Sequence, residues 1–200
     1  MNEWIRQLVV NMGYVGLALL TFVENVFPPL PSEVILPLGG FLASQGRLTL
    51  AGVVLAGTAG SLMGAVVLYY VGRWFSQERL ERWATDHGAW LLLTANDVQQ
   101  AFDWFGRHGR AVVFFGRLVP GIRSLISIPA GACGMRMAPF LLYTALGTAL
   151  WSALLAYGGN LLGEQYESLG RVLRWATYAV IALLLVAIIS WAVKRRRSDE

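Results

Sequence analysis

Two arginines in an apolar stretch are the residues best suited to bind a ligand. Arg117 and Arg123 lie within residues 114–135, a membrane-like sequence that prolines and glycines interrupt. Insertion of a guanidinium near the centre of a bilayer costs roughly 2.5 to 3.5 kcal/mol, so two of them in one apolar stretch indicate a functional role. Because the guanidinium fork matches phosphate or carboxylate, the pair predicts an anion site facing a cavity. The alternative is that both side chains snorkel to the surface or neutralise buried acids.

Two acids occupy the corresponding place in the first half of the chain. Glu24 and Glu33 flank a run of prolines in the sequence ENVFPPLPSE, within an otherwise apolar region. An anion that competes for the arginines would leave these carboxylates free to carry a proton or a sodium ion, which predicts a coupling site. The alternative is a permanent cluster of four charges that only holds the fold together.

Prolines and a glycine predict where two helical hairpins turn back. The apolar arms beside them are shorter than the roughly 20 residues that a helix needs to cross a bilayer. We therefore predict one re-entrant hairpin over residues 12–43 and a second over residues 111–135. The predicted breaks are Pro28, Pro29, Pro31 and Pro37 in the first hairpin, and Pro120, Pro129 and Gly131 in the second.

Three longer apolar runs predict transmembrane helices, at residues 51–72, 139–159 and 172–193. The polar sequence between the first span and the second hairpin predicts interfacial helices over residues 76–109, and a basic tail, 194–200, ends the chain. The expected fold is a single-domain, all-α integral membrane protein. Basic residues gather in the tail and in the loop after the first span, which predicts a cytoplasmic C-terminus.

Composition excludes several classes of protein. The chain has 200 residues, of which 56% are hydrophobic and 14% charged, which leaves no room for a separate soluble domain. One cysteine excludes an internal disulfide, and two scattered histidines argue against a zinc site, so we expect no metal and no cofactor. The net charge of +4 predicts contact with anionic lipids rather than with nucleic acid.

The two halves of the sequence share one order of features. Each half has a charged residue, a proline, a second charged residue, a Pro-x-Gly sequence and then a full span. The charges are acidic in the first half and basic in the second. This weak repeat predicts one hairpin entering from each face of the membrane, which is the inverted-repeat plan of secondary transporters with a site near the midplane.

At these residues the chain resembles the DedA family of membrane proteins, related to the VTT or SNARE-associated group. The matching motifs are Glu24-Asn25, PLPSE at 29–33, YYVGR at 69–73, FGRLVPGIR at 115–123, Ala130-Gly131, and Gly147 with Trp151. The resemblance implies a bacterial cytoplasmic-membrane protein with two re-entrant hairpins that moves lipids, undecaprenyl phosphate among them. It also implies that Glu24, Glu33, Arg117 and Arg123 are the essential residues. Ala65 departs from the family, in which many members carry an acidic or polar residue there.

The leading hypothesis is a transporter, not an enzyme, that translocates a phosphate-headed isoprenoid lipid coupled to protons or sodium. A second possibility is a proton- or cation-coupled exporter of small solutes. An intramembrane lipid phosphatase or transferase would need a nucleophile or base beside the arginines, and no histidine lies in the apolar parts. A fourth possibility is a non-catalytic assembly factor, which the small-residue face at Gly60 and Gly64 favours. A homo-oligomer is a further possible partner.

Overall fold

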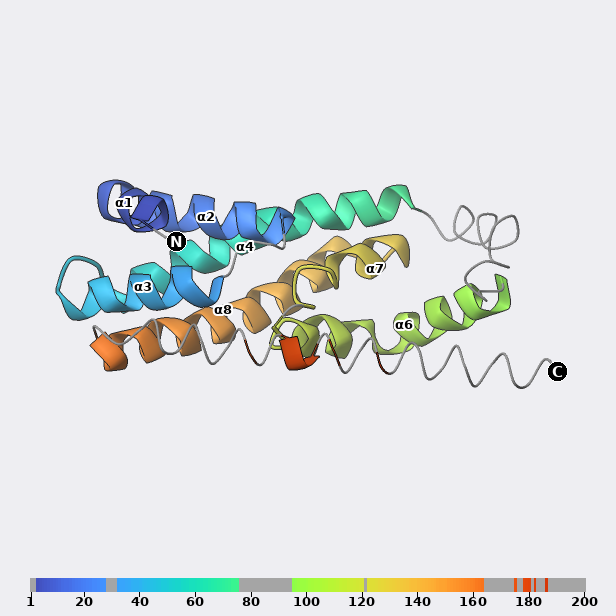
Figure 1. The fold of residues 1–200 in the computed structure, drawn as a ribbon. Helices are drawn as coiled ribbons and strands as arrows, with labels where there is room; N and C mark the ends of the chain where they lie inside the picture. Colours follow the sequence, from blue (N-terminus) through green and yellow to red (C-terminus); the bar gives the residue numbers. More distant parts are fainter. Residues whose placement is uncertain are drawn as a thin grey trace.

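The computed structural model describes most of the chain as a set of packed helices. It describes residues 3–27, 32–75, 95–120 and 122–163, together with residues 175, 178–180, 182 and 186. Within these ranges every regular element is helical, which confirms the all-α class (Figure 1). The helices are α1 Glu3–Met12, α2 Tyr14–Val26, α3 Ser32–Ser44, α4 Leu50–Trp74, α6 Ala95–Gly116, α7 Ser127–Ala132 and α8 Met137–Leu162.

Among the described residues, two helices are long and apolar enough to cross a bilayer. They are α4, with 25 residues, and α8, with 26 residues, and they contain the predicted spans 51–72 and 139–159. Along α8 a row of leucines at every fourth position is 51–56% exposed, as expected for a helix face that meets lipid rather than water. The row consists of Leu142, Leu146, Leu150 and Leu154. Of the predicted span 172–193 only residues 175, 178–180, 182 and 186 are described, and all of them are helical. The tail 194–200 and the first part of the predicted interfacial region, 76–94, lie outside the described residues.

The first predicted hairpin is a pair of short helices. Helices α2 and α3 have 13 residues each, fewer than the roughly 20 needed for a crossing. Pro28, Pro29 and Pro31 belong to the segment between them, which lies outside the described residues. Pro37 is not a break, because it lies inside α3. There it costs one backbone hydrogen bond, and its carbonyl packs directly on Gly159 of α8.

The second predicted hairpin differs from the prediction at both ends. Helix α6 runs without a break from Ala95 to Gly116, so the predicted interfacial segment and the first arm of the hairpin are one helix. Pro120 lies in the turns that follow, as predicted. Pro129 and Gly131 do not break a helix but belong to α7. Pro129 is its third residue, in the first turn, where a missing N–H costs little because that group has no helical partner.

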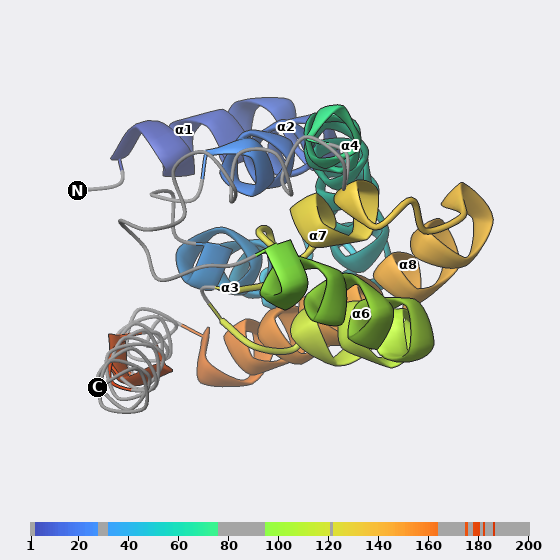
Figure 2. The ribbon, with the colours of Figure 1, turned by 90° about the vertical axis from the view of Figure 1, so that its right-hand side faces the viewer.

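The second arm of each helix pair packs on the long helix of the other half. Helix α3 lies along α8, and α7 lies along α4 (Figures 1 and 2). The backbones touch at glycines: a Cβ on Gly40 would overlap the Ala156 carbonyl, and a Cβ on Gly131 would overlap that of Tyr69. Only residues without a side chain allow helices to approach this closely.

Helices α4 and α8 run antiparallel beside each other. Gly57, near the start of α4, faces Ser152 near the end of α8, whereas Tyr69 near the end of α4 stacks on Phe140 near the start of α8, with ring centroids 4.8 Å apart. The segment 117–126, between α6 and α7, carries both arginines and meets the end of α2 through the ion pair of Arg123 with Glu24. That junction holds the predicted site.

Candidate functional site

Both predicted arginines are buried in the segment between α6 and α7. Arg117 is 2% exposed and Arg123 is 6% exposed. Helix α6 ends at Gly116, so Arg117 begins a series of turns in which backbone groups leave the regular helical pattern. A buried guanidinium needs partners for its five donors, because an unpaired buried charge is very costly. The contacts of these two side chains therefore define the site.

Arg117 donates to a hydroxyl rather than to an acid. Its terminal nitrogen lies 2.5 Å from Oγ of Ser127, the first residue of α7. Its aliphatic stem packs against Gly147 of α8, where an added Cβ would lie 2.9 Å from Cβ of Arg117. Within the described residues, Nε of Arg117 has no hydrogen-bond partner. The site thus retains a buried positive charge and a free donor.

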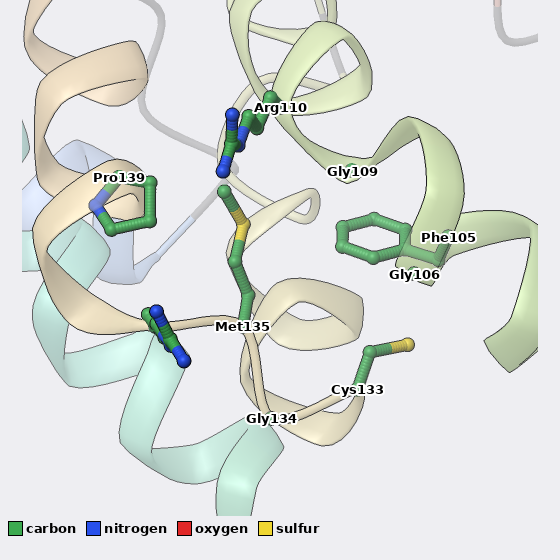
Figure 3. Close-up of a pocket in the computed structure, with 9 residues that line it drawn as sticks. Phe105, Gly106, Gly109, Arg110, Cys133, Gly134, Met135 and Pro139 are labelled. Atoms are coloured by element: carbon green, nitrogen blue, oxygen red, sulfur yellow. The ribbon is translucent and has the colours of Figure 1, made fainter.

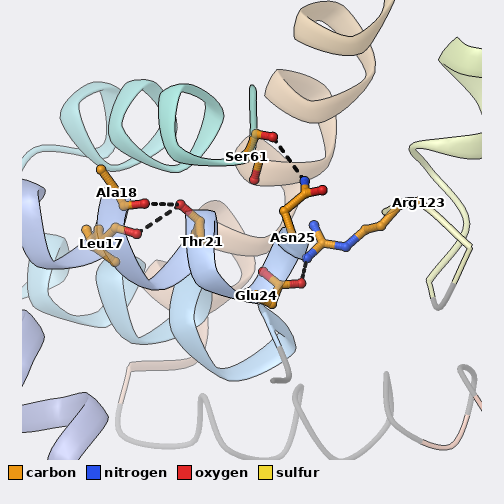
Figure 4. Close-up of polar contacts among 7 residues, drawn as sticks. All are labelled: Leu17, Ala18, Thr21, Glu24, Asn25, Ser61 and Arg123. Carbon is orange, nitrogen blue, oxygen red and sulfur yellow. Dashed lines mark hydrogen bonds and ion pairs between the residues drawn. The ribbon is translucent and has the colours of Figure 1, made fainter. Parts of the chain in front are cut away.

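Arg123 forms a buried ion pair with Glu24, which is 4% exposed at the end of α2 (Figure 4). The other carboxylate oxygen, Oε2 of Glu24, has no partner within the described residues. Next to it, the side-chain amide of Asn25 donates to the backbone carbonyl of Ser61 at 3.0 Å, which ties the end of α2 to α4. The carbonyl oxygen of the Asn25 side chain is also without a partner in the part of the chain described.

The ion pair is only partly satisfied, and this matters for function. A buried pair stabilises a fold only when further hydrogen bonds satisfy its remaining donors and acceptors. Here neither Oε2 of Glu24 nor Nε of Arg117 has a hydrogen-bond partner among the described residues. Unsatisfied buried polar groups are rare in native proteins and are explained by a ligand, an ion or water. The arrangement can therefore accept an anion at the guanidiniums and a proton or cation at the carboxylate.

A row of hydroxyls on α8 extends this polar centre, and the sequence reading missed it. Thr144, Thr148 and Ser152 repeat every four residues, are at most 3% exposed, and have hydroxyl oxygens without partners among the described residues. The indole nitrogen of Trp151 also has no hydrogen-bond partner among the described residues. The helical spacing of hydroxyl residues inside an apolar span is the signal that could have revealed the row.

The structure brings together two of the four predicted site residues, Glu24 and Arg123. Glu24 meets Arg123, whereas Glu33 lies in the first turn of α3 and its side chain lies outside the described part of the structure. No group of three metal-ligating side chains occurs within the described residues. The predicted meeting of two carboxylates with two guanidiniums is thus observed for Glu24 and Arg123. Within the described residues, Arg117 donates to Ser127.

Comparison with known proteins gives the family of the chain. The VTT domain matches residues 30–161, which include α3, α4 and the arginine segment. The chain belongs to the VTT domain family, the DedA group of membrane proteins. The exposed leucines of α8 agree with a bacterial membrane protein.

Relatives of known name differ in the activity that their names state. The chain is 44% identical to an alkaline phosphatase-like protein of Lactococcus lactis, over 94% of this chain and 89% of that protein. It is 32% identical to undecaprenyl phosphate transporter A of Staphylococcus aureus, over 97% of this chain and 96% of that protein. It is 29% identical to the inner membrane protein YqjA of Escherichia coli, over 78% and 70%. No solved structure gives a significant match.

Proposed function

We propose that the protein translocates a phosphate-headed isoprenoid lipid, such as undecaprenyl phosphate, across the cytoplasmic membrane. The observation that carries the proposal is the buried ion pair of Arg123 with Glu24. A second buried arginine, Arg117, has an Nε donor without a hydrogen-bond partner among the described residues. Phosphate is the anion best matched to two guanidiniums. The name of the Staphylococcus aureus relative, at 32% identity over nearly the full chain, supports this substrate class.

Competition for Arg123 provides the coupling. A phosphate that approaches Arg117 and Arg123 displaces the Glu24 carboxylate from its ion pair, and the freed carboxylate takes up a proton or a sodium ion. Glu33 is the second carrier in this scheme, on the opposite arm of the same helix pair. When the phosphate leaves, Glu24 releases its cation and pairs with Arg123 again, so binding of the anion and of the cation are linked.

The crossed packing of the helix pairs supports an inverted repeat with two re-entrant hairpins. Each second arm lies on the long helix of the other half, and α4 and α8 run in opposite directions. In such a plan the site lies near the midplane and opens alternately to either face. Only the headgroup needs shielding, because the isoprenoid tail stays in the lipid beside the exposed leucines of α8. A small protein therefore suffices.

Translocation in vesicles tests the proposal directly. The protein is reconstituted with a fluorescent undecaprenyl phosphate analogue, and a membrane-impermeant quencher reports how fast the headgroup changes leaflets. We expect transfer that depends on Arg123 and is accelerated by a proton or sodium gradient, whereas Arg107→Ala, an exposed change on α6, leaves the rate unchanged.

Two results would contradict the proposal. Release of inorganic phosphate from the lipid, without headgroup transfer, would indicate a phosphatase and agree with the name of the Lactococcus lactis relative. Gradient-driven export of a small solute without any lipid transfer would indicate the exporter alternative.

A further inference from the structure

A second cationic site lies away from the buried arginines, in a pocket of about 290 Å³ between α6 and the loop that joins α7 to α8 (Figure 3). Its floor is apolar, with Phe105, Met135 and Pro139, and its charged members are Arg110 and Arg136. The lining contains no acidic residue. Figure 3 shows the Arg110 side chain reaching from α6 towards Met135, with Phe105 facing the same space.

The two arginines of this pocket are available for a ligand. Both are exposed, and within the described residues neither takes part in an ion pair or a side-chain hydrogen bond. Arg136 is also the N-cap of α8 and its side chain makes no capping bond, so the first N–H groups of a 26-residue helix add partial positive charge on the same side. An anion is the chemistry that satisfies these groups together.

The surroundings of the pocket indicate that the anion belongs to a lipid. Trp104, on the same helix, is 52% exposed, and an exposed tryptophan is typical of the membrane–water interface. Small-molecule pockets measure roughly 300 to 1,000 Å³, so this pocket is the size of a headgroup rather than of a whole lipid. The apolar floor suits the glycerol and first methylenes that adjoin a phosphate.

We propose that this pocket binds the phosphate headgroup of a membrane lipid at the interface, with Arg110 and Arg136 as its ligands. The site is separate from the buried Arg117 and Arg123 and does not depend on the proposed transport. It would hold a lipid against α6 and the start of α8, two helices that also pack around Arg117. The positive-inside rule assigns the end of the molecule that holds this pocket, at the α7–α8 loop, to the cytoplasmic face.

The single cysteine of the chain provides a local readout. Cys133 lines the pocket and is partly buried, so a bound headgroup should slow its alkylation by N-ethylmaleimide. The experiment uses the full chain in detergent and titrates dioctanoyl phosphatidic acid. The comparison probes are dioctanoyl phosphatidylcholine, which has no net charge, and inorganic phosphate. We expect protection by phosphatidic acid only.

Three variants and a matched control sharpen the test. Arg110→Gln and Arg136→Gln should each raise the half-protecting concentration about tenfold or more, because each removes a charge-assisted hydrogen bond. Gly106→Leu should weaken protection without changing charge, because it adds a bulky side chain at a lining position where a Cβ meets no atom within 4 Å. Arg107→Gln removes an exposed arginine that does not line the pocket and should have no effect.

Several outcomes would overturn the proposal. Equal protection by phosphatidylcholine would show that the phosphate charge is not recognised, and equal protection by inorganic phosphate would show a free-anion site. A loss with Arg107→Gln as large as with Arg110→Gln would reduce the effect to general surface charge. Arg117→Lys separates the two proposals: it should impair transport and leave the protection of Cys133 intact.

Discussion

The two buried arginines have different partners, and this difference predicts different roles. Arg123 is balanced by Glu24, so its charge becomes available to a ligand only when the pair opens. Arg117 donates to the Ser127 hydroxyl, and its Nε has no partner among the described residues, so it can bind an anion without the opening of an ion pair described here. The sequence could predict that arginines and acids meet, because buried charges need opposite charges. It could not predict the serine partner, because a serine in an apolar helix has several local partners of its own.

Exchange of either arginine for lysine tests the need for a guanidinium. We expect Arg117→Lys and Arg123→Lys each to reduce headgroup transfer in vesicles about tenfold or more, because an ammonium keeps the charge but cannot bind phosphate through a planar fork. Arg107→Lys, on the exposed face of α6, is the matched control and should leave the rate unchanged. Full activity in both buried lysine variants, with loss only on replacement by alanine, would show that the arginines act as point charges.

Replacement of Glu24 by glutamine separates coupling from structure. Glutamine keeps the shape of the side chain and some hydrogen bonding to Arg123, so we expect melting temperature and lipid binding to stay near wild type while gradient-driven transfer is lost. Glu33→Gln should behave in the same way. The exposed Asp103→Asn on α6 serves as control.

The opposite pattern would identify a purely structural pair. Loss of one member of a buried ion pair typically costs about 3 to 5 kcal/mol, which would appear as a large fall in melting temperature. Near-wild-type melting together with unchanged gradient-driven transfer in both glutamine variants would remove the coupling role from these acids.

At the scale of helices, the sequence predicted lengths and turns better than the positions of breaks. Short apolar arms beside prolines predicted two helices in the first hairpin, and α2 and α3 are such helices. Pro37 and Pro129 were wrong as breaks, because the effect of a proline depends on its place in the helix and on what packs against it. Neither the helix start nor the partner helix is visible in local sequence.

A single methyl group at a helix crossing tests the crossed packing. Gly159→Ala would place a Cβ onto the Pro37 carbonyl, and we expect it to destabilise the protein by about 1 to 3 kcal/mol. Gly106→Ala is the matched control, because it makes the same change in a helix where a Cβ meets no atom within 4 Å. It should be neutral or stabilising by up to about 1 kcal/mol. Thermal unfolding of both purified variants provides the comparison, and equal melting temperatures would contradict the close approach of α3 to α8.

At the scale of the whole molecule, α8 exposes apolar side chains and buries several polar ones. The exposed leucines of α8 lie opposite the buried hydroxyls of Thr144, Thr148 and Ser152, which is the reverse of a water-soluble helix. Hydropathy could predict that α8 is apolar enough to span a membrane, because it averages over both faces of the helix. It could not identify the polar interior, which becomes visible only when α4 and the arginine segment are placed against α8.

Accessibility of the two ends of α4 tests the orientation in the membrane. Arg47 is exposed just before α4, whereas Arg136 lies at the other end, where Tyr69 of α4 donates a hydrogen bond to the Met135 carbonyl. In a Cys133→Ser background, we expect Arg47→Cys to react with an impermeant thiol reagent added to intact cells. Arg136→Cys should react only after lysis, because basic residues concentrate at its end and favour the cytoplasmic side. The reverse pattern would invert the orientation, and equal labelling of both positions in intact cells would show that α4 does not separate them across the membrane.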